Sequence, residues 1–157
     1  MSKKEEIISI LSGHDVVIHT NSDDGFDWLE DGCVSIIIDN RMYIDLEGQI
    51  TLGIGSWHTH YDAYRRDYNY FLNNLKGILD NEKCSMDIFC KDEWLYSNLI
   101  DAVGITEDGL KEQVWKELNR ESRHKIVLNG YRIECRFMDP EKDIVIEVES
   151  NIIPAKS

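Results

Sequence analysis

Three short apolar runs in the first half of the chain constrain the fold most strongly. Residues 33–39, 42–46 and 49–54 are rich in β-branched and other apolar side chains. The polar dipeptides that follow the first two runs, Asp39–Asn40 and Glu47–Gly48, are short connectors of the kind that join β-hairpins. The pattern therefore predicts an antiparallel meander.

Two further elements are predicted ahead of the meander. Residues 3–11 have the apolar spacing of a short amphipathic helix, and Gly13 is placed to end it. Residues 15–20 have the composition of a strand, and the turn-forming residues 21–25 follow it. We therefore expect a helix and a strand before the three runs.

A longer helix is predicted after residue 62. Its apolar residues recur at spacings of three and four: Tyr64, Tyr68, Phe71, Leu72, Leu75, Ile78 and Leu79. This spacing places them on one face of a helix. We expect helix 63–79 to pack on a sheet face.

Strands and helices are both predicted in the second half. We expect strands at 84–90 and 94–96, helical segments after Ser97 on both sides of Gly104, and Thr106 as the N-cap of a helix over 107–118. Strands are predicted at 124–128, 131–137 and 143–149, with Asn129–Gly130 as a hairpin turn and a frayed tail after residue 150.

Together these elements predict an α+β fold in which antiparallel strand meanders pack against one long central helix plus shorter helices. A chain of 157 residues suits a single domain, which we expect over residues 1–157. The four dispersed cysteines contain no C-x-x-C pair, so we expect reduced core thiols.

The charge of the chain restricts its partners. Asp and Glu number 30 against 17 Lys and Arg, which gives a formal net charge of −13. This excess disfavours nucleic acid and anionic membranes and favours a basic protein partner. The N-terminus lacks the features of a signal peptide, and no apolar run has the length of a membrane span, so we expect a cytoplasmic protein. Pairing between edge strands of two chains would also allow a homodimer.

The acids are concentrated between Asn21 and Ile50, where eight Asp and Glu residues lie against Arg41 alone. We call residues 23–31 within this stretch the acidic-aromatic segment. It interleaves carboxylates with aromatic side chains: Asp23, Asp24, Phe26, Asp27, Trp28, Glu30 and Asp31. Aromatic residues ringed by acids suit a binding surface, because the rings supply buried area and the acids steer a basic partner. The alternative is that Phe26, Trp28 and Leu29 plug the core beneath an acidic loop.

A second candidate site is the histidine motif Trp57-His-Thr-His-Tyr-Asp62. In an extended segment, residues two apart point the same way, so His58, His60 and Asp62 could share a metal ion such as zinc, with His19 as a further ligand. An open coordination position would allow metal-dependent hydrolysis. Two alternatives remain: Trp57, His58 and His60 belong to a binding surface without metal, or Asp62 caps the following helix.

The same motif carries a resemblance. The segment from about Ile50 to Phe89 resembles small bacterial proteins with a W-H-x-H-[FY]-D corner, which include uncharacterised families and immunity proteins of polymorphic-toxin systems. This resemblance implies a toxin-neutralising or accessory role and no catalytic residue. The leading expectation is therefore a non-enzymatic, protein-binding immunity protein without a cofactor, and the alternative is a metal-binding protein or metal-dependent hydrolase.

Overall fold

The computed structural model describes residues 2–62 and 64–150. The predicted α+β class is confirmed, and the strands form two separate antiparallel sheets. The chain divides into two compact units, Met1–Ile54 with His58–Leu79, and Gly55–Trp57 with Asp80–Ser157. The single domain stays a prediction, because compactness alone does not show whether a unit folds independently.

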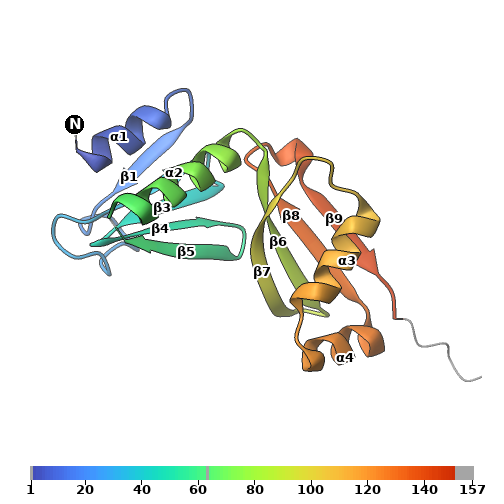
Figure 1. Ribbon diagram of the computed structural model, residues 1–157. Helices are drawn as coiled ribbons and strands as arrows, with labels where there is room; N and C mark the ends of the chain where they lie inside the picture. Colours follow the sequence, from blue (N-terminus) through green and yellow to red (C-terminus); the bar gives the residue numbers. More distant parts are fainter. Residues whose placement is uncertain (1, 63, 151–157) are drawn as a thin grey trace, which may run out of the picture. The chain divides into compact units, whose positions relative to one another are not determined.

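The first unit contains a five-stranded sheet in the order β1-β2-β3-β4-β5 (Figure 1). Its strands are β1 (Val16–His19), β2 (Val34–Ile38), β3 (Met42–Leu46), β4 (Gln49–Ile54) and β5 (Trp57–Asp62). β1 to β4 are paired antiparallel in sequence order, so the predicted meander is confirmed. The continuation of the sheet into β5 was not predicted.

Two helices belong to this unit, α1 (Lys3–Ile10) and α2 (Arg65–Leu79). A capping box between Ser2 and Glu5 stabilises the start of α1. The inner face of the sheet is apolar, because Ile36, Ile44 and Leu52 are register neighbours and are fully buried. Buried residues of the two helices and the C-cap of α1 complete this core: Ile7, Phe71, Leu75 and Ile78 in the helices and Leu11 at the cap.

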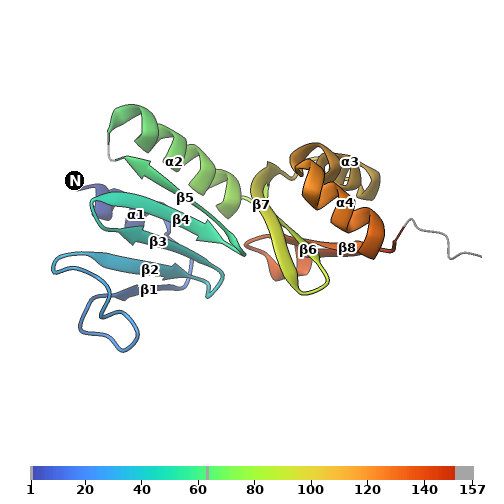
Figure 2. The ribbon, with the colours of Figure 1, turned by 90° about the horizontal axis from the view of Figure 1, so that it is seen from below.

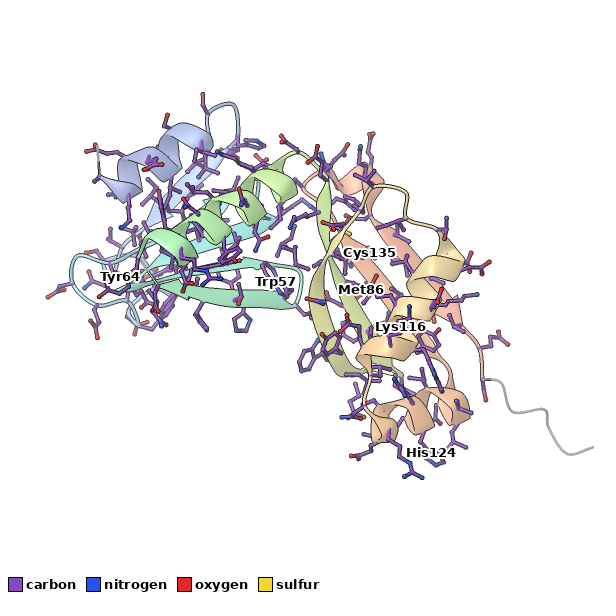
Figure 3. The ribbon with its side chains drawn as sticks, viewed as in Figure 1. Trp57, Tyr64, Met86, Lys116, His124 and Cys135 are labelled. Carbon is purple, nitrogen blue, oxygen red and sulfur yellow. The ribbon has the colours of Figure 1, made fainter. Side chains whose placement is uncertain are left out.

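The second unit contains a four-stranded sheet in the order β7-β6-β8-β9. Its elements are β6 (Lys83–Cys90), β7 (Glu93–Asp101), α3 (Glu107–Glu117), α4 (Arg120–Asn129), β8 (Tyr131–Arg136), a 3₁₀ turn η1 (Pro140–Lys142) and β9 (Ile144–Val148). Both helices lie on one side of this sheet (Figure 2). Met86 and Cys135, paired in register on β6 and β8, lie in the core with Val114 and Ile126 of the helices (Figure 3).

Two predicted elements and one predicted turn of this unit are wrong. The helical segment after Ser97 is the second half of β7, which pairs with β6 along its whole length. The strand at 124–128 is part of α4, whose N-cap Asn119 accepts a bond from the backbone of Ser122. Asn129–Gly130 is not a hairpin turn, because Gly130 ends α4 at φ 74°.

Within residues 2–62 and 64–150, the predicted single long central helix is also not found. α2 begins near the predicted position and is 15 residues long, but it belongs to the first unit. The core of the second unit is instead covered by α3 and α4, of 11 and 10 residues. The predicted N-cap Thr106 is confirmed, since its hydroxyl accepts a bond from Gly109.

The cysteines are free thiols, as expected. Cys84, Cys90 and Cys135 are buried and Cys33 is half-buried. A hydrogen bond with the Cys135 thiol, together with burial, raises the pKa of Cys84 above its ordinary value. Among the helices of the described ranges, 2–62 and 64–150, none has the length and apolar character needed to cross a membrane.

Candidate functional site

The acidic-aromatic segment lies in the loop between β1 and β2, where its charged residues face solvent. All five carboxylates are exposed: Asp23, Asp24, Asp27, Glu30 and Asp31. Trp28 is 52% exposed, whereas Leu29 is only 3% exposed. The core-plug alternative therefore holds for Leu29 and is wrong for Trp28, and the loop presents an indole among carboxylates.

Several contacts hold this loop in one conformation. The Phe26 ring stacks on the imidazole of His19 with centroids 4.0 Å apart. His19 Nδ1 also lies 3.3 Å from a carboxylate oxygen of Asp23, and that same oxygen accepts the Thr20 backbone N–H at 2.9 Å. The indole N–H of Trp28 donates to the Gly25 carbonyl at 2.9 Å. These contacts link the loop to the end of β1 and restrain its conformation.

The histidine motif is a strand rather than a corner. His58, His60 and Asp62 alternate along β5 with the half-buried Trp57 and the buried Tyr61, and all three are exposed. The two imidazole centroids lie 5.5 Å apart with the ring planes at 74°. His60 Nδ1 lies 2.8 Å from the hydroxyl of Thr51 on β4. The strand therefore brings both histidines to one face, as the spacing predicts.

Asp62 does not cap the following helix. β5 extends through Asp62, and α2 begins at Arg65. The first helical bond runs from the Tyr68 N–H to the Tyr64 carbonyl, which puts Tyr64 at the N-cap position. The carboxylate of Asp62 instead accepts from the Gln49 side chain at 3.5 Å.

His19 cannot join His58 and His60 around one ion. β1 and β5 are the two opposite edges of the sheet, with three strands between them. Neighbouring strands lie about 4.8 Å apart, so the two edges are separated by roughly 19 Å. The prediction of His19 as a further metal ligand is wrong, because the order of the strands was unknown.

A buried polar pair on the outer face of the same sheet was missed. The Ser35 hydroxyl donates to the Asp45 carboxylate at 2.5 Å, and both residues are buried. Burial raises the pKa of Asp45, and the bond from Ser35 only partly offsets this effect. The register aligns His19, Ser35, Asp45 and Thr51 across β1 to β4, and Thr51 then contacts His60. The available signal was Asp45, the single charged residue within the apolar run 42–46.

The three-ligand metal site stays a prediction. Within residues 2–62 and 64–150, no group of three or more His, Cys, Asp or Glu side chains is arranged to hold a metal ion. His58 and His60 share a face with Asp62, but the carboxylate is bonded to Gln49. For Asp62 to act as a third ligand, its carboxylate would therefore have to exchange its hydrogen bond with Gln49 for a bond to the metal ion.

A surface cavity of about 360 Å³ lies in the second unit. None of its lining residues belongs to the acidic-aromatic segment or to the histidine motif. The cavity is lined by Lys91, Asn129, Gly130, Tyr131, Arg132, Glu147, Val148 and Glu149. The two cations, Lys91 and Arg132, are balanced by the carboxylates of Glu147 and Glu149, so the described lining has no net formal charge.

Comparison with known proteins assigns no function to the acidic-aromatic segment or to the histidine motif. The resemblance of the histidine motif to small bacterial immunity proteins stays a prediction. No protein-family model matches the chain, and neither a curated protein nor a solved structure matches it.

Proposed function

We propose that this protein is a non-enzymatic binding module that captures a basic protein through its acidic-aromatic segment, in the manner of an immunity protein that neutralises a toxin. The observation that carries the proposal is the exposure of Trp28 among the exposed carboxylates of residues 23–31. The resemblance of the histidine motif to immunity proteins of polymorphic-toxin systems adds support.

The charged and the aromatic side chains of the segment contribute to binding in different ways. Carboxylates raise the rate of encounter with a positively charged surface, and this effect weakens with salt. An aromatic side chain that becomes buried supplies much of the binding energy. The Phe26–His19 stack and the hydrogen bonds of Asp23 and Trp28 restrain the loop, so less conformational entropy is lost on binding.

The cytoplasm is the compartment that we propose for this role. All four cysteines are free thiols, and three of them are buried. Free thiols are the usual state in a reducing compartment. The −13 net charge also fits a partner that is itself strongly basic.

The first experiment reverses charges that have no role in the loop's own conformation. Asp24, Asp27 and Glu30 are exposed, and their carboxylates make none of the hydrogen bonds or ion pairs found in the described ranges. We expect Asp24→Lys/Asp27→Lys/Glu30→Lys to lower the association rate with a basic partner at least tenfold at low salt. The partner is first isolated from the source cells with the wild-type protein and then purified for kinetics.

A matched control carries the same charge change elsewhere. Asp108→Lys/Glu121→Lys/Glu141→Lys alters three exposed acids of the second unit. We expect this control to retain the partner with an association rate close to that of the wild type. Equal rates for the two triple variants would remove the acidic-aromatic segment as the binding surface.

Trp28 is tested separately, because its contribution is apolar. Trp94 offers a matched control: both side chains are 52% exposed, and both indole N–H groups donate a hydrogen bond, to Gly25 and Ser97 respectively. We expect Trp28→Ala to raise the dissociation rate about thirtyfold, equivalent to about 2 kcal/mol at a binding hot spot. Trp94→Ala should leave it unchanged. A similar loss for both would contradict the assignment.

A further inference from the structure

We propose that His58 and His60 form a surface site for a divalent transition-metal ion such as Zn²⁺, with water in the remaining coordination positions. This site is distinct from the proposed protein-binding function. The two histidines occupy alternate positions of β5, both are exposed, and their ring centroids are 5.5 Å apart. Neutral imidazole is a common ligand of zinc and of its neighbours in the first transition row.

The separation of the rings suits a shared ion. Two imidazoles that bind one zinc ion in tetrahedral geometry, with Zn–N bonds of about 2.0–2.1 Å, have their centroids about 5 Å apart. The observed 5.5 Å is close to this separation. Strand geometry directs both Cβ atoms to this face, and the contact with Thr51 restrains the His60 ring.

Thr51 prepares one ring for this role. Its hydroxyl lies 2.8 Å from Nδ1 of His60. When Nδ1 donates its proton to the hydroxyl, Nε2 carries the lone pair that a metal ion needs. A hydrogen bond to the second ring nitrogen is the usual way in which proteins orient a metal-binding histidine. Thr51 is therefore a positioning residue rather than a ligand.

The surrounding charge also favours a cation. Asp62 is exposed on the same face of β5, two residues beyond His60. Its carboxylate accepts a bond of 3.5 Å from Gln49, so it adds negative charge without being required as a ligand. With two protein ligands, the site should bind metal reversibly and more weakly than a closed four-ligand structural site.

The test is calorimetric titration of the untagged, metal-free protein with ZnCl₂. We expect one zinc ion per chain, with affinity reduced at least tenfold in both His58→Ala and His60→Ala. Thr51→Val should weaken binding about tenfold, as loss of an orienting bond usually does. His124→Ala is the matched control, because His124 is an exposed histidine on α4 (Figure 3) and should leave the affinity unchanged.

Two further measurements keep the test decisive. The melting temperatures of the metal-free variants should equal that of the wild type, because His58 and His60 are exposed. The triple variant Asp24→Lys/Asp27→Lys/Glu30→Lys should still bind zinc, which separates this site from the protein-binding surface. Absence of zinc binding, or binding that both His58→Ala and His60→Ala leave intact, would overturn the proposal.

Discussion

The imidazole of His19 and the ring of Phe26 stack almost parallel, with centroids 4.0 Å apart and planes inclined by 7°. His19 ends β1, and Phe26 lies in the middle of the acidic-aromatic segment. The stack therefore joins the rigid sheet to the loop that we propose as the binding surface. Contacts that order a binding loop in the free protein reduce the entropy lost on binding, which favours affinity.

Phe26→Ala should loosen the loop. Loss of the stack is expected to lower the free energy of unfolding by about 1 kcal/mol, since aromatic pairs contribute about 0.5–1.5 kcal/mol beyond the area that they bury. Urea denaturation measures this change. Asp27→Ala is the comparison, because an exposed side chain of the same loop should change stability by less than about 0.5 kcal/mol. Equal losses for both variants would show that the stack does not anchor the loop.

Gly53→Ala should disturb the outer face of the first sheet. A Cβ atom at this position would lie 2.3 Å from two ring atoms of Tyr43, so the ring must move. We expect a loss of about 1–3 kcal/mol in the free energy of unfolding, as is usual for overpacking. Combining Gly53→Ala with Tyr43→Ser removes the collision, so the double variant should lose less than the sum of the two single changes.

Stability should fall at acidic pH through Asp39. Burial tends to raise the pKa of this carboxyl, but hydrogen bonds from His14 and the Asp15 backbone, with the charge of His14, lower it below its ordinary value of 3.8. A depressed pKa stabilises the folded state above the unfolded-state value, and this contribution is lost as the pH falls from 3.8 through the folded-state pKa.

Asp39→Asn tests this pH dependence directly. Asn tolerates the left-handed backbone that Asp39 adopts, at φ 52°, so the substitution should retain the turn. Denaturation curves collected below pH 4 should show a smaller loss of stability with falling pH than in the wild type. Asp92→Asn, at an exposed position, should leave the pH profile unchanged. Identical slopes in all three proteins would contradict the role of Asp39.

Asn119→Ala tests the identity of α4. The side-chain oxygen of Asn119 accepts the Ser122 backbone N–H at 2.8 Å and so satisfies a bond that the helix itself cannot make. Its loss should lower the free energy of unfolding by about 1 kcal/mol. Asn73→Ala, on the exposed side of α2, should change stability by less than about 0.5 kcal/mol. No difference between the two would argue against the cap.

Local patterns were sufficient where the responsible residues are close in sequence. The meander β2 to β4 could be predicted because its strands are joined by connectors of a few residues. α2 followed from apolar residues spaced by three and four, and the start of α3 followed from Thr106. In the candidate sites, the exposed carboxylates of residues 23–31 and the shared face of His58 and His60 also follow from local pattern.

Tertiary structure decided what depends on distant partners. Residues 97–101 form a strand because β6 offers a complete pairing edge, and 124–128 are helical between the caps Asn119 and Gly130. The strand order alone places His19 on the edge opposite His58, and the fold buries Leu29 while leaving Trp28 exposed. A short apolar segment is compatible with either a helix or a strand. The sequence by itself therefore determined the elements with clear local patterns, whereas long-range pairing and burial determined which structure the ambiguous segments adopt and which side chains are exposed.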